Sequence, residues 1–406
     1  MIITKQRGSK KMDVSVVGLG YIGLPTAITL ALHGHKVKGF DVSKDVVKKL
    51  NEGHIHIVEE GLQSLFEKVL NDRNFCAYDT LQASDVYIIS VPTPFKDDDN
   101  EKIADLSYVE NAARLVASKL KPGDLVILES TVPPMTTAKM TDLLVEESGI
   151  SRKEFFTAHC PERVLPGNIM YEMEHNDRII GAESQEAAQM AKKLYESFLT
   201  EGQVFMTDDV TAEMCKLVEN SYRDVNIAFA NELSIICDKL KIKVEELIEL
   251  ANKHPRVNIL SPGVGVGGHC LAVDPYFIVG EFKDDARLID TARAVNTWKP
   301  YYISNRLEER LKENNQNTVT ILGLSYKPDI DDFRESPSII LAKDLQNKGF
   351  NVKGCDPNTD KRMIEGIPMV SMDEALDESG VLVLTQRHKA FLERADELQA
   401  AKCICI

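Results

Sequence analysis

The sequence predicts an α/β protein in which two doubly wound domains are joined by a helical central domain with a long spine helix. Three observations support this class. A strand, a glycine-rich turn, a helix, a second strand and an acid follow one another over residues 13–41, and residues 317–356 repeat this order without the glycine fingerprint. Between these segments, Thr207–Leu240 contains no glycine or proline and carries apolar residues at helical spacing.

Composition excludes several classes of function. The 406 residues suggest two or three domains at about 150 residues each, and the net charge of −15 argues against nucleic acid or an anionic membrane as a partner. No apolar run approaches the ~18 residues that span a bilayer, and Met1–Lys11 lacks the apolar core of a signal peptide. The cysteines show no C-x-x-C spacing, and Cys403 and Cys405 lack partners for zinc. We therefore expect reduced thiols, no metal site and a cytoplasmic location.

The first strand, turn and helix have the spacing of a dinucleotide-binding site. Asp13–Gly20 reads as a strand, and Gly18, Gly20 and Gly23 then give G-x-G-x-x-G before the helix Pro25–His33. Glycines at these places let the backbone approach a pyrophosphate at a helix N-terminus, where exposed N–H groups attract anions. The segment therefore predicts the first turn of a Rossmann-like domain.

Asp41 ends the next predicted strand of this domain. A carboxylate there accepts hydrogen bonds from ribose hydroxyls and repels a 2′-phosphate, so NAD is favoured over NADP. The predicted strands Asp85–Ser90 and Leu125–Leu128 run into Thr93 and Thr131. Because ligands in open α/β sheets lie beyond the carboxyl ends of strands, either threonine could contact the cofactor, or each could be an ordinary turn residue.

Two further groups of polar residues allow a functional and an ordinary interpretation. Glu162 could activate water and Arg163 could hold a phosphate or carboxylate, or the two could form a surface ion pair. On the long helix, Lys216, Asn220 and Arg223 share one face, where they could grip an oxygen-rich substrate or form a solvated stripe. The length of the helix suits a spine joining two domains or two subunits.

A glycine-rich stretch, Gly263–Pro275, places Cys270 four residues before Asp274. A run of glycines indicates that a backbone or a ligand must come close. Cys270 could be a nucleophile, with Asp274 assisting proton movement, or it could be a small buried cysteine in a turn. His254 and Arg256 precede this stretch and could belong to the site or to a surface turn.

The last predicted domain repeats the first without its glycine fingerprint. Val319–Gly323 reads as a strand and Ser336–Lys348 as a helix capped by its serine. A Rossmann-like domain without a pyrophosphate loop suggests a different nucleotide ligand. Tyr326, Lys327 and Arg334 lie in the strand-to-helix loop, where such a ligand would bind.

Seven motifs together resemble the UDP-glucose/GDP-mannose dehydrogenase family, whose members oxidise a nucleotide-sugar CH₂OH group to a carboxylate with two NAD⁺. The resemblance runs from about Val14 to about Leu384. The motifs are GLGYIG at 18–23, VPTP at 91–94, STVP at 130–133, PER at 161–163, EMCKLVENSYR at 213–223, GGHC at 267–270 and KPDIDDFRESP at 327–337. The HPRVNIL segment at 254–260 is similar to the members that act on UDP-N-acetyl-D-mannosamine.

The resemblance implies roles for individual residues. NAD is expected at the three glycines of the first turn together with Tyr21, Ile22, Asp41, Thr93, Thr131 and Arg334. The UDP-sugar is expected at Arg163, Val164, Lys216, Asn220, Arg223, Gly267, Tyr326 and Lys327. His254 and Arg256 also bind it, and in this family such residues can come from the partner subunit. Cys270 is the expected nucleophile and Lys216 the proton donor or acceptor, with Glu162, Asn220 and Asp274 as further catalytic residues.

The resemblance also implies an organisation into domains and a reaction. The expected domains are an NAD-binding domain at 12–205, a central domain at 206–312 that forms a homodimer through its long helix, and a UDP-sugar-binding domain at 313–406. The basic and polar composition of residues 1–11 predicts a flexible extension before them. The expected reaction is the four-electron oxidation of UDP-N-acetyl-D-mannosamine at C6 through a cysteine thiohemiacetal and thioester. Alternatives are the same chemistry on UDP-N-acetylglucosamine, UDP-glucose or GDP-mannose, a one-step NAD dehydrogenase of hydroxy acids, and a non-catalytic NAD-binding regulator.

Overall fold

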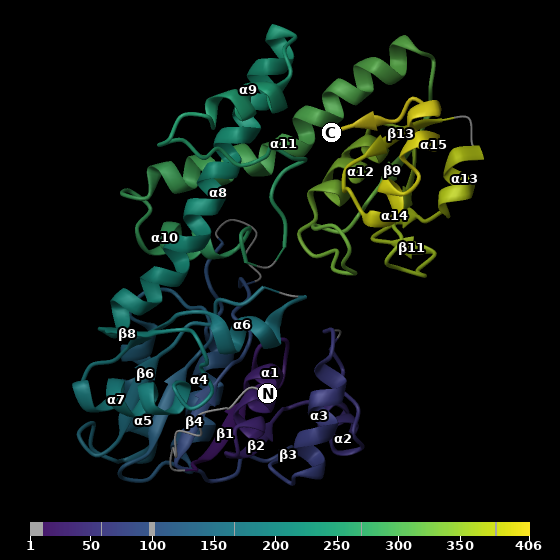
Figure 1. The fold of residues 1–406 in the computed structure, drawn as a ribbon. Helices are drawn as coiled ribbons and strands as arrows, with labels where there is room; N and C mark the ends of the chain where they lie inside the picture. The colour runs from purple at the N-terminus through teal and green to yellow at the C-terminus, as the bar shows by residue number, and fades with distance from the viewer. Residues whose placement is uncertain (1–10, 58, 97–101, 166, 269, 378–379) are drawn as a thin grey trace. The chain divides into compact units, whose positions relative to one another are not determined.

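The computed structural model describes residues 11–57, 59–96, 102–165, 167–268, 270–377 and 380–406. The chain divides into two compact units, the first ending at Leu217 and the second beginning at Val218. Each unit contains its own parallel-dominated sheet (Figure 1). The α/β class predicted from the sequence, with its long central helix, is confirmed. The predicted extension lies outside the described residues except for Lys11, and the predicted domain boundaries at 205 and 312 stay a prediction.

The sheet of the first unit has eight strands in the order β3-β2-β1-β4-β5-β6-β7-β8, all parallel except for the β6–β7 pair. The strands are β1 (Asp13–Val17), β2 (Lys36–Phe40), β3 (Phe75–Tyr78), β4 (Val86–Ile89), β5 (Leu125–Leu128), β6 (Phe156–His159), β7 (Arg178–Gly181) and β8 (Val204–Thr207). Its first six strands have the doubly wound order, in which the chain reverses direction between β1 and β4. The carboxyl ends of these two strands therefore form the switch point where ligands bind in such sheets.

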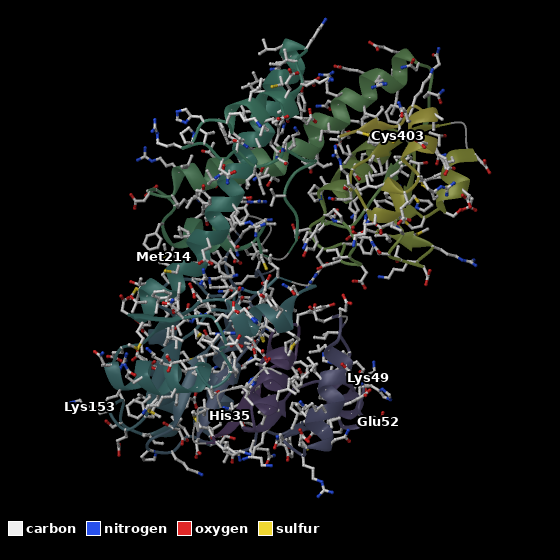
Figure 2. All side chains as sticks on the ribbon, viewed as in Figure 1. His35, Lys49, Glu52, Lys153, Met214 and Cys403 are labelled. Carbon is white, nitrogen blue, oxygen red and sulfur yellow. The ribbon has the colours of Figure 1, made fainter. Side chains whose placement is uncertain are left out.

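Helices cover both faces of the first sheet. They are α1 (Gly23–Leu32), α2 (Lys44–Asn51), α3 (Leu62–Asn71), α4 (Ser107–Ala117), α5 (Thr136–Ser148), α6 (Ile169–His175) and α7 (Gln185–Tyr195). One core cluster packs α1, α3 and α7 against the sheet, and a second packs α4 and α5 against its other face. Strands buried on both faces need apolar residues throughout, as the LVIL sequence of β5 illustrates. At the C-terminal end of α2, the charged residues Lys49 and Glu52 are exposed to solvent (Figure 2).

The long helix α8 (Asp209–Leu240) has 32 residues and begins in the first unit. The second unit continues with α9 (Val244–Ala251), α10 (Asp274–Glu281) and α11 (Arg287–Glu313). Within this unit α8 and α11 share a buried polar contact, in which Arg293 donates to the Asp224 carboxylate at 2.7 Å and Asn231 donates to Asn296 at 2.9 Å. The uninterrupted helix predicted for Thr207–Leu240 is therefore present, with its first turn at Asp209.

The second sheet is parallel, with the order β10-β9-β13-β14. Its strands are β9 (Thr318–Leu322), β10 (Asn351–Cys355), β13 (Val381–Leu384) and β14 (Ile404–Cys405), and β11 (Met363–Ile364) pairs with β12 (Ile367–Pro368). The accompanying helices are α12 (Pro337–Asn347), α13 (Met372–Asp377), α14 (Lys389–Leu392) and α15 (Ala395–Ala400). One core cluster packs α11 and α12 on this sheet, and another packs α13 to α15. Because β10 lies on one side of β9 and the later strand β13 on the other, the switch point lies between β9 and β13.

Ser336 occupies the N-cap position of α12, but its side chain makes no capping hydrogen bond. Pro337 follows it and has no N–H group. The N–H of Ile339 donates instead to the backbone carbonyl of Ser336 at 3.1 Å. The sequence therefore predicted the N-cap position of Ser336 correctly, but the capping hydrogen bond predicted from its side chain is not formed.

Three absences hold for the described residues. None of their helices combines the length and apolar character needed to cross a membrane. No group of three or more of their histidine, cysteine, aspartate and glutamate side chains is arranged to hold a metal ion. Their cysteines form no disulfide, and Cys403, labelled in Figure 2, packs beside the core under β13.

Candidate active site

The glycine turn after β1 combines close packing with one open position. A Cβ atom on Gly18, which has φ +93°, would lie 2.4 Å from the Ser90 carbonyl oxygen. A Cβ atom on Gly23 would lie 1.9 Å from the carbonyl oxygen of Gly18. A Cβ atom on Gly20 would meet nothing within 4 Å. Gly18 and Gly23 are therefore required by the fold of the turn, whereas Gly20 leaves space where a ligand can approach the backbone.

Asp41 is held at the rim of this turn. Its Oδ2 accepts the N–H of Leu19 at 3.0 Å, and its Oδ1 accepts the N–H of Ser43 at 2.8 Å. Each carboxylate oxygen can accept a further hydrogen bond, so the group retains capacity for hydroxyls of a ligand. Tyr21 is 43% exposed in the same turn, and Ile22 is the N-cap of α1.

The two strand-end threonines are brought together. The hydroxyl of Thr93, after β4, donates to the carbonyl oxygen of Thr131, after β5, at 2.7 Å. Ser130 joins the same two loops, since its Oγ accepts the N–H of Val91 at 2.9 Å and donates to the Val91 carbonyl at 2.8 Å. The sequence placed both threonines at this edge, and the structure links their loops beside the switch point.

Glu213, in the first turns of α8, is a residue that the sequence reasoning missed. Its carboxylate accepts the N–H of Met135 at 2.6 Å, and the N–H and hydroxyl of Thr137 at 2.7 and 2.6 Å. It thereby caps α5 from another helix and joins the Thr131 loop to the part of α8 that carries Lys216. Burial raises the pKa of Glu213. Its signal in the sequence was the EMCK motif, whose next residue, Met214, is labelled in Figure 2.

Glu162 is buried and organises the turn that follows β6. Its Oε1 accepts the N–H groups of Arg163 and Val164 at 2.6 and 3.2 Å, and its Oε2 accepts from the Arg178 guanidinium at 2.9 Å. The side chains of Glu162 and Arg178 are 6% and 5% exposed. The interpretation of Glu162 and Arg163 as a surface ion pair is therefore wrong, because the Glu162 carboxylate is buried and pairs with Arg178 of β7. The guanidinium of Arg163 donates to the Asp177 carbonyl at 3.1 Å.

A second buried carboxylate, Glu129, lies close to this ion pair. It follows β5 and accepts hydrogen bonds from the hydroxyls of Thr26 at 3.0 Å and Tyr195 at 3.2 Å. Burial, and then repulsion by Glu162, raise the pKa of Glu129 from 4.5 to about 7, although Arg178 opposes the change. The two carboxylates of Glu129 and Glu162 therefore both interact electrostatically with the buried guanidinium of Arg178, next to the turn that carries Arg163.

This arrangement gives the stability of the fold a defined dependence on pH. Because the pKa of Glu129 is raised to about 7 on folding, the folded state holds a proton that the unfolded chain releases near pH 4.5. The stabilisation of the folded state by this proton is complete below pH 4.5 and is lost as the pH rises to about 7. Urea denaturation should show that the unfolding free energy of Glu129→Gln rises relative to that of the parent as the pH increases. Between pH 5 and pH 8 we expect this difference to change by about 2 kcal/mol in favour of the variant. A difference that stays constant over this range would contradict the assignment.

In the second unit, three predicted catalytic residues form one cluster. Cys270 is exposed, so its interpretation as a buried turn cysteine is wrong. The Cys270 carbonyl oxygen accepts the N–H groups of Val273 at 3.0 Å and of Asp274 at 2.8 Å, at the start of α10. The Asn220 side chain on α8 donates to the Asp274 carboxylate at 2.5 Å, and both are buried. The cysteine therefore sits on a turn anchored to the long helix.

The glycine run before Cys270 packs against the loop after β9. A Cβ atom on Gly267 would lie 2.4 Å from the Glu335 carbonyl oxygen, and one on Gly268, which has φ +84°, would lie 2.7 Å from the Tyr326 ring. The N–H of Gly268 donates to the Arg334 carbonyl at 3.2 Å. The close approach that the glycines predict is therefore made by this loop. The neighbouring Lys327 is exposed.

Four further residues of the predicted site remain, three in the second unit and one in the first. Arg223 on α8 is exposed, as are His254 and Arg256 in the turn after α9. In the described part of the second unit, no hydrogen bond connects these three residues to Cys270. Lys216 is half-buried and belongs to the first unit. The roles of all four residues stay predictions.

Family comparisons cover almost the whole chain. Models of the UDP-glucose/GDP-mannose dehydrogenase family match residues 12–199 as its NAD binding domain, 210–298 as its central domain and 320–404 as its UDP binding domain.

Individual relatives match at similar length. A UDP-N-acetyl-D-mannosamine dehydrogenase of Campylobacter jejuni is 46% identical over 404 residues, covering 96% of this chain and 98% of the relative. An NDP-N-acetyl-D-galactosaminuronic acid dehydrogenase of Ralstonia nicotianae is 44% identical over 399 residues, covering 95% and 93%. Among solved structures, a UDP-N-acetylmannosamine dehydrogenase from Pyrococcus horikoshii superposes with a TM-score of 0.89 at 41% identity, covering 96% of this chain and 93% of that one.

Proposed function

Because the chain belongs to the UDP-glucose/GDP-mannose dehydrogenase family, we propose that it oxidises UDP-N-acetyl-D-mannosamine at C6 to UDP-N-acetyl-D-mannosaminuronate with two NAD⁺. The observation that carries the chemistry is the exposed residue Cys270, on a turn held by the Asn220–Asp274 hydrogen bond. The relative of highest identity reported above supports the choice of sugar. The reaction is expected in the cytoplasm, where NAD⁺ and nucleotide sugars are available.

The first unit fits NAD⁺, the cofactor of this family. The open position at Gly20 supports binding of a pyrophosphate at the N-terminus of α1, and the remaining acceptor capacity of Asp41 supports hydrogen bonds from ribose hydroxyls. We assign Gly18, Tyr21, Ile22, Gly23, Thr93 and Thr131 to the same site, with Arg334 as a further ligand. When bound, NAD⁺ supplies the acceptor for a hydride.

The glycine turn allows a test of this site that separates binding from folding. Gly20→Ala should leave the melting temperature unchanged, since its Cβ atom meets nothing within 4 Å. The same methyl group would occupy the space of the ligand, so the KM for NAD⁺ should rise about ten-fold. Gly23→Ala is the matched control and should lower the melting temperature, because its Cβ atom would lie 1.9 Å from a backbone oxygen. An unchanged KM in Gly20→Ala would contradict the assignment.

The thiol of Cys270 is needed because the reaction removes four electrons from one carbon. When the C6 alcohol loses a hydride and a proton it becomes an aldehyde, which has no second hydride to give at a tetrahedral carbon. Addition of the Cys270 thiolate forms a thiohemiacetal, and loss of a second hydride and proton leaves a thioester. Water then attacks the thioester, which releases the carboxylate and restores the thiol. Hydrolysis makes the sequence irreversible.

The other residues of the site move protons and stabilise charge. Lys216 is assigned as the proton donor or acceptor, and its ammonium form would stabilise the oxyanion at each tetrahedral stage. Asp274, held by Asn220, is the better candidate for placing water, since its N–H donates to the Cys270 carbonyl at 2.8 Å and it therefore lies on the turn of the nucleophile. Glu162 would act chiefly by shaping the turn of Arg163 and Val164.

Following the family resemblance, we assign the UDP-sugar to Arg163, Val164, Lys216, Asn220, Arg223, Gly267, Tyr326 and Lys327. His254 and Arg256 are assigned to the site of the second copy in a homodimer. Their exposure within one chain supports this assignment.

A homodimer is supported by the exposed face of α8. Five apolar side chains, 45–64% exposed, recur at helical spacing along it: Val218, Tyr222, Phe229, Ile236 and Leu240. Such a stripe costs free energy in water, and a second copy of the same helix would cover it.

The choice of sugar is tested by initial rates on a panel of nucleotide sugars. The panel contains UDP-N-acetylmannosamine, UDP-N-acetylglucosamine, UDP-N-acetylgalactosamine, UDP-glucose and GDP-mannose. The galactosamine epimer is included because the Ralstonia relative carries a galactosaminuronic name. We expect kcat/KM to be highest for UDP-N-acetylmannosamine by about ten-fold or more. A higher value on any other sugar would overturn the choice.

A further inference from the structure

The second sheet contains an acid that matches Asp41 of the first. Asp356 follows β10 as Asp41 follows β2, and its Oδ2 accepts the N–H of Leu324 at 2.8 Å, as Asp41 accepts that of Leu19. Its Oδ1 accepts the N–H of Asn358 at 3.1 Å, as Asp41 accepts that of Ser43. The repeat seen in the sequence therefore extends to the hydrogen bonds of the acid.

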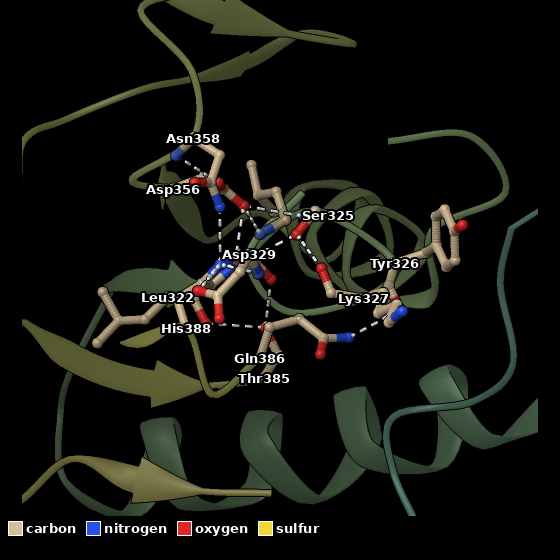
Figure 3. Close-up of polar contacts among 12 residues, drawn as sticks. Leu322, Ser325, Tyr326, Lys327, Asp329, Asp356, Asn358, Thr385, Gln386 and His388 are labelled. Atoms are coloured by element: carbon tan, nitrogen blue, oxygen red, sulfur yellow. Dashed lines mark hydrogen bonds and ion pairs between the residues drawn. The ribbon is translucent and has the colours of Figure 1, made fainter. Parts of the chain in front are cut away.

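The surroundings of the two acids differ. Asp41 is half-buried, whereas the side chain of Asp356 is 0% exposed because the imidazole of His388 lies against it (Figure 3). The Nε2 atom of His388 is 3.4 Å from Asp356 Oδ2 and 3.3 Å from the hydroxyl of Ser325. The carboxylate that follows β10 is thus engaged inside the protein and is not available to ribose hydroxyls.

The hydrogen bonds determine the tautomer of His388. Its Nδ1 atom receives the backbone N–H of Asp329 at 2.9 Å and lies 3.0 Å from the side-chain nitrogen of Asn358. A backbone N–H can only donate, so Nδ1 must carry the lone pair. The proton is then on Nε2, which points toward Asp356 and Ser325. The imidazole therefore bridges the end of β10 to the loop after β9 in one defined orientation.

This bridge holds the loop Ser325–Asp329 at both ends (Figure 3). At its start, the N–H of Ser325 donates to Asp356 at 3.0 Å. At its end, Asp329 donates to His388 and has φ +61°, a left-handed conformation that a non-glycine residue adopts only when its surroundings hold it. Between them, the Gln386 side chain donates to the Tyr326 carbonyl at 3.3 Å. The two exposed side chains of the loop, Lys327 and Asp329, therefore project from a rigid base.

The loop also sets the position of the turn that carries Cys270. The ring of Tyr326 occupies the space that only glycine at 268 leaves open. A displacement of this loop would therefore change both the predicted UDP-binding residues and the packing of the glycine run before the nucleophile.

We propose that His388 is a positioning residue for substrate. Held with its proton on Nε2, it couples Asp356 to the loop Ser325–Asp329 and thereby orients Tyr326 and Lys327 toward a uridine diphosphate. The proposal rests on the proposed function, because it assumes that this loop binds the UDP part of the substrate. It assigns no contact between His388 and the ligand.

The test uses the full chain and UDP alone as the probe, by isothermal calorimetry. His388→Leu removes the acceptor for the Asp329 N–H and should weaken UDP binding about ten-fold, while NAD⁺ binding changes by less than about two-fold. His388→Asn keeps a side-chain oxygen that can accept this N–H and should recover most of the affinity. Phe391→Leu, which alters packing against the same ring at 5.3 Å, is the matched control and should bind UDP as the parent does.

The outcomes separate this inference from the function on which it rests. If the parent chain fails to bind UDP, the proposed function is wrong and the inference falls with it. If the parent binds UDP and His388→Leu binds it equally well, or loses NAD⁺ to the same extent, only the positioning role is overturned. Should His388→Leu not fold, Gln386→Ala gives the same readout, because it releases the Tyr326 carbonyl from a half-buried site. Nitrogen-15 spectra of the parent must also show His388 with an unprotonated Nδ1.

Discussion

Cys270→Ser is expected to stop the reaction after its first oxidation. A serine hydroxyl stays protonated at neutral pH and is a far weaker nucleophile than a thiolate, so the aldehyde would not be captured. Steady-state formation of the uronate should fall about a thousand-fold or more, while the first hydride transfer persists. Single-turnover measurement of NADH, with mass spectrometry of the sugar product, should find one NADH and a retained aldehyde.

The control for this variant is another exposed cysteine of the same unit. Cys405→Ser, at β14, should leave turnover within about two-fold of the parent, because Cys405 lies at an edge strand away from the glycine run. Full conversion to the uronate by Cys270→Ser would remove the cysteine from the mechanism.

Arg178→Met is expected to lower the free energy of unfolding by about 3–5 kcal/mol. The guanidinium of Arg178 is the only charge partner of Glu162 among the hydrogen bonds described, and it also faces the buried Glu129. Its Cζ atom lies over the rings of Tyr195 and Phe198, at 4.7 and 5.2 Å from their centroids. Methionine keeps part of this packing but leaves a buried carboxylate without a cation.

Denaturant unfolding of the variants measures this effect. Arg152→Met is the matched control, since Arg152 pairs with Glu183 at the surface and should contribute less than about 1 kcal/mol. The double variant Arg178→Met, Glu162→Gln should recover part of the loss, because it removes the charge left unpaired. Equal losses in the two single variants would show that burial of the pair has no energetic consequence.

The parts of the fold that the sequence predicted well depend on local spacing. The strand, glycine turn and acid over residues 13–41 are contiguous in the chain, and β1, α1 and β2 appear there with helix α1 starting at Gly23 rather than Pro25. Strands β7 and β8 were not predicted. Each is four residues long, and β7 begins with the buried Arg178, which pairs with a carboxylate from the turn after β6.

The residues of the candidate site also divide into those that local motifs predict and those that depend on contacts between distant parts of the chain. Thr93, Thr131 and Cys270 could be proposed because each lies in a motif at a strand end or a glycine run. Glu213 and His388 could not, because each acts on a segment far away in the chain: Glu213 on the start of α5, and His388 on the loop after β9. Such roles depend on which strands and helices lie next to each other in the fold, and the spacing of residues along the chain does not specify this.

The proposed reaction removes two hydrides from a single carbon of the sugar. The most direct test is the ratio of NADH to uronate formed by the parent chain from UDP-N-acetyl-D-mannosamine, with absorbance for NADH and mass spectrometry for the sugar. The mechanism predicts two NADH for each uronate, with no aldehyde released. One NADH for each product molecule, with the sugar recovered as an aldehyde, would contradict it.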